Sequence, residues 1–475
     1  MGGFFGVVSN KESSRTLYYG TDYHSHLGTK RGGMAVTGED GRIVAIIHDI
    51  ASTQFRAKFD SHMDRLKGQC GIGVISDYDD QPLTIYSRLG TYSIVTVGKI
   101  NNLEALVEDS FNNHHSGHYL AMSGGIINPT ELIATLINQK TTFEEGIEYA
   151  ASKIKGSMSI LIMCNNVLYA ARDRYGRTPV FIGQSHDTTA VSMEDAAFLN
   201  LGLKMVLELG PGQIVKLTPE TITELKPARK EMQICAFLWV YYGYPSSTYE
   251  AKNAEVFRSN SGAIMQKTKP APPVDLICGV PDSGVGYAIG YSNAASCNYG
   301  RALVKYSPTW ARSFMPPEQS LRDLVSKMKL IPVEELIKDH RLLFCDDSIV
   351  RGTQLRNIIY RLMTIGAKEV HMRIACPPLL YGCPYLNFSR SKNDYDLITR
   401  RVIADLEPEN PSPDIESYRD PNSEKHKKMV EAICKIIGAS SLEFQTLEGL
   451  LQAIDLPQEK ICTYCFNGCD RYNQK

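Results

Sequence analysis

The sequence lacks any apolar run of the ~18 residues that a membrane-spanning helix needs. It also lacks an excess of charge of either sign, because 51 basic residues face 52 acidic ones and the formal net charge is −1. A strongly basic face for nucleic acid or for an anionic membrane is therefore not expected. The first ten residues carry no basic segment followed by a long apolar one. We therefore expect no secretory signal, a cytoplasmic protein, and neither nucleic acid nor membrane among its partners.

Disulfide bonds are a second feature that we expect to be missing. The chain has 12 cysteines, but in a reducing compartment these are thiols or metal ligands. Cys164, Cys278, Cys345 and Cys434 lie in apolar runs and are expected to pack as small buried side chains. The C-terminal group Cys462-Thr-Tyr-Cys465-Phe-Asn-Gly-Cys469 does not fit that description and is considered below as a ligand set.

What the sequence does contain is two halves with different patterns, in a length of 475 residues that suits two to four domains. Residues 1–228 are rich in strand patterns, and Asn165-Asn166 between two apolar runs is a hairpin signal. The pattern that begins at Pro129 is helical. Residues 229–475 alternate strand and helix patterns, which is typical of a parallel sheet. We therefore expect two domains that meet near residue 228.

The second half contains three buried strand patterns, at 274–280, 342–345 and 370–375. Between the last two lies one apolar helix face, and Gly366 follows it in the usual position for a glycine after a helix. The apolar positions of this face are Leu355, Ile358, Ile359, Leu362 and Met363. Strand, helix and strand at this spacing predict a βαβ unit. The stretch 407–428, rich in Pro, Asp, Ser and Lys, is expected to be a polar loop or an insertion.

The strongest chemical signal follows the strand pattern at 342–345. There Asp346 and Asp347 are followed by Ser348-Ile349-Val350-Arg351-Gly352-Thr353 and then by the helix. Ligands bind beyond the carboxyl ends of parallel strands, loop amides and a helix N-terminus suit a phosphate, and two acids suit ribose hydroxyls or Mg²⁺. The loop is not of the GxxxxGK[ST] type. For the short string DDS alone, a capped helix with two solvated acids is the alternative.

The whole string DDSIVRGT resembles the phosphoribosyl diphosphate (PRPP) loop of type I phosphoribosyltransferases. A second loop, Val280-Pro-Asp-Ser283-Gly, also follows a strand pattern. With FMPPEQSLRDLVSKMKL (314–330), GAKEVHMRIACPP (366–378) and the final CTYC, these motifs resemble the glutamine PRPP amidotransferase (amidophosphoribosyltransferase) family. In the first half, YYG at 18–20, ARD at 171–173 and GPG at 210–212 fit the family's glutaminase domain. The resemblance therefore runs nearly end to end.

This resemblance implies the fold class. Residues 1–228 are expected to form an α+β N-terminal-nucleophile amidotransferase-like sandwich with αββα layers. Residues 229–475 are expected to form an α/β type I phosphoribosyltransferase domain with a parallel sheet and a cysteine-bearing tail. The family's reaction is the first committed step of purine synthesis. Glutamine is hydrolysed in the first domain, and in the second the ammonia displaces pyrophosphate from PRPP, giving 5-phosphoribosylamine.

The resemblance also assigns roles in the second domain. Ser283, Asp346 and Asp347 are implied to hold Mg²⁺, the two aspartates are the catalytic pair beside the ribose, and residues 348–353 hold the 5′-phosphate. The segment 312–329 is implied to close over the pyrophosphate as a lid, whose cations are Arg312, Arg322, Lys327 and Lys329. A departing pyrophosphate needs positioning, metal and excluded water more than covalent catalysis. For any single lid cation, a solvated surface charge is the alternative.

The glutaminase motifs are broken. The family's nucleophile is an N-terminal cysteine, but here Gly2 stands at the missing nucleophile position, and glycine cannot form the glutamyl thioester. The segment 73–78 lacks the family's glutamine-binding arginine, 96–100 lacks its oxyanion asparagine, and 123–126 lacks the acid that holds the substrate's amino group. Cys70 is internal and has no free α-amine, so we do not expect it to replace the nucleophile. We predict a first domain without glutaminase activity.

The segment 235–247 also departs from the family. It stands where the family has CxFExxYFxRPDS, with Leu238 in place of the acid and Tyr244 in place of the arginine. It lies near the expected domain junction, so an altered transfer of ammonia is expected. The PRPP loop itself is complete.

Some family members carry a 4Fe–4S cluster on four cysteines, and the matching positions here are Cys235, Cys383, Cys462 and Cys465. Four thiolates suit such a cluster. Zn²⁺ would suit them as well, and a CxxC pair in a helical tail can also arise by chance. A cluster at these positions is expected to tie the C-terminal tail to the core.

We therefore predict a synthase that forms 5-phosphoribosylamine and pyrophosphate from PRPP with ammonia, either free or supplied by a separate glutaminase partner. Its predicted cofactors are Mg²⁺ and a 4Fe–4S cluster. The family further implies a homo-oligomer and purine nucleotides as effectors. Two alternatives stay open: a non-catalytic PRPP or nucleotide sensor that regulates an active homologue, and a phosphoribosyltransferase with another nitrogen nucleophile.

Overall fold

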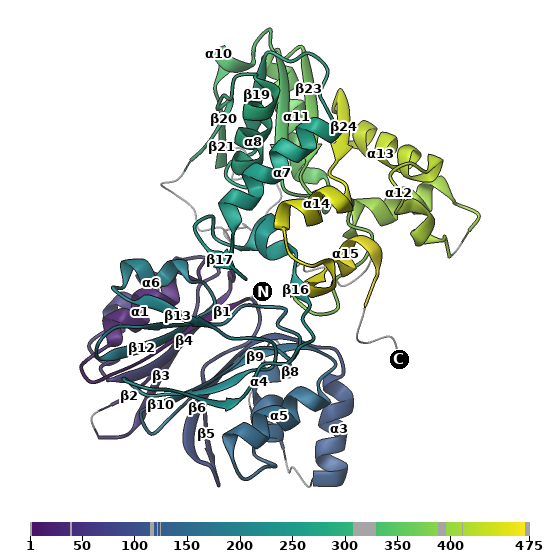
Figure 1. Cartoon of the computed structure of the whole chain (residues 1–475). Helices are drawn as coiled ribbons and strands as arrows, with labels where there is room; N and C mark the ends of the chain where they lie inside the picture. The colour runs from purple at the N-terminus through teal and green to yellow at the C-terminus, as the bar shows by residue number, and fades with distance from the viewer. Residues whose placement is uncertain are drawn as a thin grey trace. The chain divides into compact units, whose positions relative to one another are not determined.

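The protein is described by a computed structural model that covers residues 2–38, 40–114, 118–120, 122–123, 125–306, 329–387, 396–410 and 412–470. The chain divides into two compact units (Figure 1). Within the described residues, the first unit contains 2–234 and 384–387, and the second contains 235–306, 329–383, 396–410 and 412–470. In this part of the chain no helix combines the length and the apolar character needed to cross a membrane.

The first unit contains two large antiparallel sheets. The seven-stranded sheet has the order β13–β11–β12–β1–β4–β2–β3, with β1 Gly3–Ser9, β2 Arg31–Thr37, β3 Ile43–Asp49, β4 Cys70–Ser76, β11 Phe181–Gln184, β12 Thr188–Ser192 and β13 Lys204–Glu208. The six-stranded sheet has the order β15–β14–β10–β9–β6–β5, with β5 Leu83–Ser87, β6 Gly90–Ile100, β9 Gly156–Cys164, β10 Val167–Ala171, β14 Ile214–Leu217 and β15 Ile222–Lys226. A short hairpin pairs β7 (Met122–Ser123) with β8 (Ile126–Ile127).

Four layers result, because helices cover the outer faces of both sheets (Figure 1). One apolar core lies between the sheets and includes Phe4 and Ile72 from the first and Val95 and Leu161 from the second. The outer helices of the first sheet are α1 (Ser14–Asp22) and α6 (Ala196–Asn200), and those of the second are α3 (Leu103–His114), α4 (Pro129–Ile137) and α5 (Phe143–Lys153). The short α2 (Phe55–Phe59) and η1 (Asp60–His62) follow β3. The predicted αββα sandwich is confirmed.

Local sequence signals explain several of these elements. Strand β1 is buried on both faces, so it reads as the apolar run GFFGVVS without alternation. Asn165 and Asn166 have φ values of 50° and 56°, the left-handed conformation that a two-residue hairpin requires, and they join β9 to β10 as predicted. Helix α4 begins at Pro129, and the Asn128 side chain caps it by accepting from Thr130 N.

A short segment from late in the chain also belongs to the first unit. The Tyr385 ring lies 3.3 Å from the buried guanidinium of Arg177, measured from the ring centroid to Cζ. Asn101 Nδ2 donates to Pro384 O at 2.6 Å. Residues 375–383, which follow β23, belong to the second unit. The chain then returns to the first unit at 384–387.

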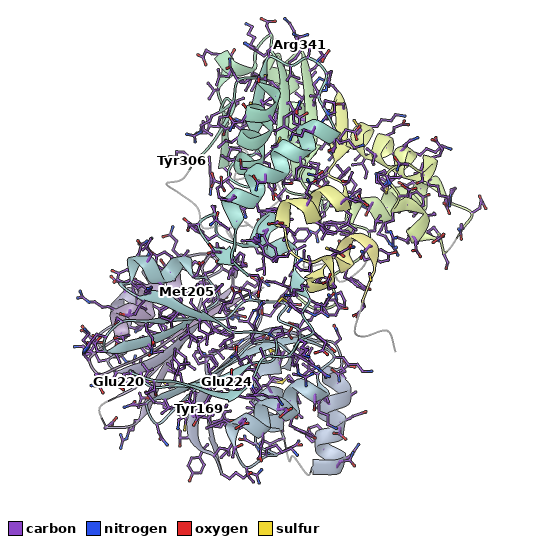
Figure 2. The ribbon with its side chains drawn as sticks, in the orientation of Figure 1. Tyr169, Met205, Glu220, Glu224, Tyr306 and Arg341 are labelled. Carbon is purple, nitrogen blue, oxygen red and sulfur yellow. The ribbon has the colours of Figure 1, made fainter. Side chains whose placement is uncertain are left out.

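The second unit is built on a parallel sheet of the order β19–β22–β23–β24, as predicted. Its strands are β19 Leu276–Gly279, β22 Arg341–Asp346, β23 Glu369–Ile374 and β24 Ser441–Phe444, and a small antiparallel ribbon pairs β20 (Leu303–Lys305) with β21 (Leu330–Pro332). At the start of β22, Arg341 Nη2 lies 2.9 Å from Asp275 Oδ1 (Figure 2). The side chain and the backbone amide of Arg341 donate hydrogen bonds to the Asp275 carboxylate and hold its pKa well below the usual range.

Helices pack around this sheet. They are α7 Ala254–Thr268, α8 Val285–Ala295, α10 Glu334–Ile337, α11 Thr353–Ile365, α12 Ile398–Leu406, α13 Glu424–Ile437, α14 Leu447–Ile454 and α15 Tyr464–Asn467, with shorter turns η2 Leu238–Tyr242, η4 Ile415–Tyr418 and η5 Gln458–Lys460. The remaining short strands are β16 Ile234–Cys235, β17 Thr248–Tyr249, β18 Lys252–Asn253 and β25 Ile461–Cys462. Helix α11 buries Leu355, Ile359 and Leu362, and Gly366 ends it with φ 109°.

One expectation for this unit is wrong. The stretch 407–428 is not simply a polar loop, because it contains η4 and the start of α13. The Ser423 side chain caps α13 by accepting from His426 N at 3.1 Å. Ser423 followed by Glu424 is a helix-start signal that the polar composition conceals.

Candidate functional site

Two strand-end loops of the second unit meet at the predicted PRPP site. Strands β19 and β22 pair in parallel with Gly279 opposite Cys345, so the residues that follow each strand emerge at the same edge of the sheet. Ser283 Oγ donates to Asp346 Oδ1 at 2.8 Å, which joins the two loops directly. The structure therefore brings together the three side chains that the resemblance assigns to Mg²⁺.

The two adjacent carboxylates are poorly solvated. Asp347 is buried, its Oδ2 accepts from Ser348 Oγ at 2.5 Å, and its amide donates to Asp346 Oδ1 at 3.0 Å. Burial raises the pKa of both Asp346 and Asp347, and the neighbouring carboxylate raises that of Asp346 further. Two carboxylates that resist ionisation side by side gain from a nearby cation. This donor set fits a hard divalent ion.

The loop that follows the acids opens into α11. Gly352 lies at the N-cap of the helix with φ 76°, a conformation that glycine adopts without a steric penalty. Ile398 N donates to Val350 O at 2.8 Å and Arg401 Nη2 donates to Arg351 O at 2.7 Å, so the start of α12 supports the loop. The first amides of α11 remain available for an anion, as the predicted phosphate site requires.

The predicted lid is described only at its end. Arg312, Arg322 and Lys327 lie outside the described residues, as do all residues from 307 to 328. Lys329 follows directly, and its carbonyl oxygen accepts from Tyr306 N at 3.0 Å beside the β20–β21 ribbon. The proposed contact of this segment with pyrophosphate therefore stays a prediction.

Two residues near the acids were missed by the sequence analysis. Lys305 Nζ lies 2.5 Å from Asp282 Oδ2, so a cation stands beside the Pro-Asp-Ser-Gly loop. Cys376 is buried, and the pKa of its thiol is raised by burial and by the two aspartates. Cys376 lies two residues after the end of β23, and Lys305 ends β20. The rule that strand ends carry ligand-binding groups, applied to every strand, would have found both.

In the first unit, backbone atoms lie close to Gly2, the position at which the nucleophile was predicted to be missing. A Cβ atom on Gly2 would lie 2.5 Å from the carbonyl oxygen of Ile75 in β4. A Cβ atom on the next residue, Gly3, would lie 2.6 Å from Cδ2 of the buried His24 ring. A side chain at either position therefore requires its surroundings to move. The start of β1 has no space for a cysteine.

His24 is a buried polar group that the sequence analysis did not single out. Its Nδ1 donates to Gly20 O at 2.9 Å, and Nε2 accepts from Met193 N at 3.2 Å. Burial lowers the pKa of His24 to about 4, so the ring is neutral near pH 7. Both ring nitrogens are used by backbone groups. We therefore regard His24 as a structural residue that connects α1 to β12.

Cys70 does not lie at an accessible position. It belongs to the core between the two sheets and has no exposed surface. Burial raises the pKa of its thiol well above the usual value. Since the thiolate is the nucleophilic form of cysteine, Cys70 is poorly suited to replace the missing nucleophile.

The four predicted cluster ligands gather in the second unit around Cys465. The pKa of the Cys465 thiol is raised first by burial and then by the thiols of Cys235, Cys383 and Cys462. Cys465 O accepts from both Leu380 N and Tyr381 N, at 3.0 and 3.1 Å, and Ala236 N donates to Cys462 O at 3.2 Å. Among the described residues, no three or more His, Cys, Asp or Glu side chains lie close enough together to hold a metal ion as they stand. The donor types nevertheless fit an iron–sulfur cluster.

Comparison with known proteins extends the resemblance to the whole chain. The family model for a glutamine amidotransferase domain matches residues 69–200. The amidophosphoribosyltransferase of Methanocaldococcus jannaschii is 29% identical over 98% of this chain and 97% of its own length. That of Bacillus subtilis is 27% identical over 98% of this chain and 93% of its own.

Solved structures agree with these relatives. The glutamine PRPP amidotransferase of B. subtilis, complexed with ADP and GMP, has a TM-score of 0.83 and is 27% identical, covering 99% of this chain and 97% of that one. The predicted resemblance is therefore confirmed along nearly the full length, as is the two-part fold class.

Proposed function

We propose that this relative of the amidophosphoribosyltransferases forms 5-phosphoribosylamine and pyrophosphate from PRPP with ammonia, and does not hydrolyse glutamine in its first unit. Its similarity to these enzymes supports a glycosyltransferase-type activity in purine biosynthesis. The observation that carries the proposal is the strand-end site of Ser283, Asp346, Asp347 and the 348–353 loop, combined with a backbone-filled position at Gly2.

In this proposal, the second unit binds PRPP at its 5′-phosphate and at its pyrophosphate, on either side of the ribose. The amides of 348–353 and the N-terminus of α11 hold the 5′-phosphate. Ser283, Asp346 and Asp347 would hold Mg²⁺, which when bound neutralises the pyrophosphate oxygens. The Arg312, Lys327 and Lys329 side chains would add positive charge over the leaving group.

The reaction then needs little covalent chemistry from the protein. The ammonia lone pair forms a bond to the anomeric carbon as the bond to the pyrophosphate oxygen breaks, and its electron pair leaves with pyrophosphate. Positive charge develops on the ribose, which the negative charge of Asp346 and Asp347 favours. Loss of a proton from nitrogen completes 5-phosphoribosylamine. The residues of this chain bind and orient the reactants and exclude water.

The experiment that tests this proposal is pyrophosphate release from PRPP and Mg²⁺ by the full-length protein, with either ammonium chloride or glutamine. We expect release with ammonium alone, and loss of at least about 100-fold in Asp346→Asn/Asp347→Asn, which keeps side-chain volume but removes both charges. Asp187→Asn in the first unit, a half-buried aspartate paired with Lys11, is the control and should match the wild type in this assay. Release of pyrophosphate with glutamine as the nitrogen source would refute the proposal that the first unit does not hydrolyse glutamine.

A non-catalytic PRPP sensor is the second candidate, and the altered first unit favours it. PRPP binding without release under either condition would support this candidate over the synthase. A third candidate uses another nitrogen nucleophile, and the changed positions Leu238 and Tyr244 favour it. A screen of amines with PRPP and Mg²⁺ separates it from the first.

Further parts of the prediction remain proposals. The B. subtilis relative was solved with ADP and GMP, which supports purine nucleotides as effectors here. The cysteine set is proposed to hold a 4Fe–4S cluster that ties the C-terminal tail to the core. A homo-oligomer and a separate glutaminase partner follow from the family resemblance alone.

A further inference from the structure

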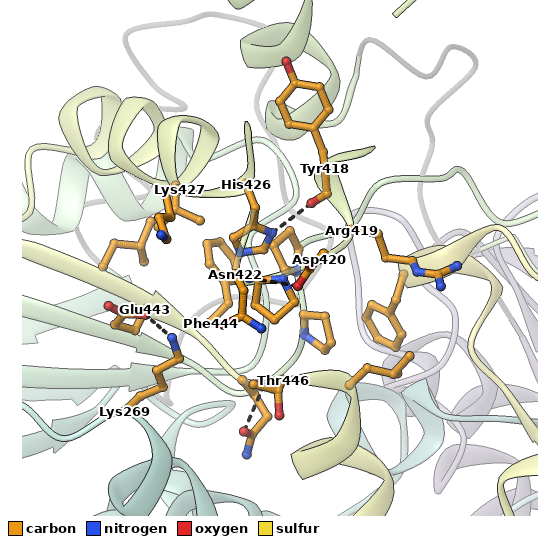
Figure 3. Close-up of a pocket in the computed structure, with 18 of the residues that line it drawn as sticks. Lys269, Tyr418, Arg419, Asp420, Asn422, His426, Lys427, Glu443, Phe444 and Thr446 are labelled. Carbon is orange, nitrogen blue, oxygen red and sulfur yellow. Dashed lines mark hydrogen bonds and ion pairs between the residues drawn. The ribbon is translucent and has the colours of Figure 1, made fainter. Parts of the chain in front are cut away.

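A cavity of about 1040 Å³ lies in the second unit (Figure 3). One wall comes from residues 418–422 and from α13, and another comes from residues 439–448, which include β24. Pro377, Pro378 and the α15 residues Phe466 and Asn467 also line it. None of the predicted PRPP-binding residues that the structure describes lines this space. It is therefore a second candidate site, separate from the strand-end loops.

His426 is the distinctive polar group of this cavity. It lies in the first turn of α13 and is only 8% exposed, yet it lines the cavity. Its Nδ1 lies 2.8 Å from Tyr418 O, and because a carbonyl oxygen can only accept, Nδ1 carries the proton (Figure 3). Among the described residues no hydrogen bond reaches Nε2. Nε2 is therefore a hydrogen-bond acceptor that faces a space large enough for a ligand.

The ring is in the form that accepts a hydrogen bond. Burial lowers the pKa of His426, and Lys269 across the cavity lowers it further. Glu443 and Asp420, which also face it, act in the opposite direction without reversing the shift. A neutral ring with its proton on Nδ1 leaves the Nε2 lone pair for a ligand N–H or O–H group.

The other lining groups indicate what the ligand carries. Four Asp and Glu side chains and four Lys and Arg side chains line the cavity, so it has no charge excess that would select a strongly charged molecule. Lys269 and Glu443 neutralise each other at 3.0 Å. Phe444, Phe466, Pro377 and Pro378 contribute apolar atoms to the lining, and Asn422 and Asn467 contribute amides. A lining of apolar atoms with a few amide groups suits a heterocycle.

We propose that this cavity binds a neutral heteroaromatic molecule of nucleoside size, whose ring amino or N–H group donates to Nε2 of His426. The site is independent of the proposed synthase activity, because it uses none of the residues assigned to PRPP.

The test is calorimetric titration of the full-length protein with adenosine and with purine riboside, which lacks only the exocyclic amino group. We expect adenosine to bind, and purine riboside to bind about tenfold or more weakly because it leaves the Nε2 acceptor unsatisfied. Equal affinities for the two compounds, or no binding of adenosine at millimolar concentration, would overturn the proposal.

Substitutions locate the binding. His426→Asn keeps a donor near the position of Nδ1, and so the bond to Tyr418, but it removes Nε2; we expect a loss of about tenfold in adenosine affinity. His340→Asn is the matched control, because His340 Nδ1 also contacts a backbone carbonyl, Lys338 O at 2.7 Å, and lies outside the cavity. Asn422→Ala alters the wall without touching His426 and is expected to weaken binding as well. Unchanged affinity in both cavity variants, or displacement of adenosine by PRPP with Mg²⁺, would refute the assignment.

Discussion

Gly2 and Gly3 limit what the start of β1 can do. Their Cβ positions are occupied by the Ile75 carbonyl oxygen and the His24 ring, which leaves room for hydrogen atoms only. If Gly2 stands where the relatives have their nucleophile, as predicted, then the carbonyl of Ile75 and the buried His24 ring lie close to the space that a side chain there would need. A reversion at one position does not recreate a site whose surroundings have closed.

We therefore predict that Gly2→Cys will not restore glutamine hydrolysis. The Cβ atom of the new side chain would lie 2.5 Å from Ile75 O. Because this contact is too close, the substitution should lower the free energy of unfolding by about 1–3 kcal/mol, the usual cost of overpacking. Glutamate release from glutamine and a denaturant titration measure the two effects. The ammonium-dependent reaction of the second unit serves as the internal control and should persist. Glutamine-dependent pyrophosphate release by this variant would contradict the prediction.

Candidate site residues could be predicted from the sequence where they follow a strand. Asp346, Asp347 and Ser283 were identified because each stands at the end of a buried apolar run, and parallel pairing of β19 and β22 brings them together. His24 and His426 were not identified. Their importance comes from burial and from contacts with residues distant in the sequence, which an isolated histidine in a polar segment does not reveal.

At the scale of elements, the turn between β19 and α8 sets the geometry of the strand-end site. A Cβ atom on Gly284 would lie 2.0 Å from Cys345 O and 2.7 Å from Val280 N. The two loops approach each other this closely only because position 284 has no side chain. The hydrogen bond from Ser283 to Asp346 depends on that approach.

We predict that Gly284→Ala will separate the loops and weaken PRPP binding at least about tenfold, with a loss of about 2–3 kcal/mol in the free energy of unfolding. Calorimetric titration with PRPP and Mg²⁺ gives the affinity, and urea unfolding gives the stability. Gly38→Ala is the matched control, since its Cβ would lie 3.2 Å from Asp40 Oδ1 and at an ordinary contact distance of 3.5 Å from Arg42 O. Wild-type affinity in Gly284→Ala would show that the close approach is unnecessary.

Element types were easier to predict than element boundaries. Periodicity identified the three strands and α11 of the βαβ unit, and the Asn165-Asn166 turn identified the β9–β10 hairpin. The stretch 407–428 was misjudged because its Pro, Asp and Ser residues suggest a loop, while the Ser423 cap and the packing of Met429 and Ile433 in the core form α13. Tertiary packing decided what local composition left open.

At the scale of the molecule, the cysteine set connects distant parts of the second unit. Cys235 opens the unit, Cys383 follows the β23 strand-end loop, and Cys462 and Cys465 lie in the tail. These positions span most of the unit's sequence, so a cluster bound to them constrains the chain far more than a local pair of ligands would.

We expect anaerobically purified protein to contain about four iron atoms and four sulfide ions per chain. Cys465→Ser should lose most of that iron and unfold at a lower temperature, because the tail loses its attachment. Cys469→Ser is the matched control and should retain the iron. Stoichiometric zinc without iron would show that the four thiols bind zinc and not a cluster. The absence of both metals would refute the proposed role of the four thiols.

The return of residues 384–387 to the first unit has an evolutionary consequence. Because Tyr385 covers Arg177 and Pro384 accepts from Asn101, the described part of the first unit is encoded by separated stretches of the gene. A recombination breakpoint near codon 234 would pair a transplanted first unit with a foreign 384–387 segment. We expect such hybrids to be selected against, because the residues that make these two contacts would come from different parents.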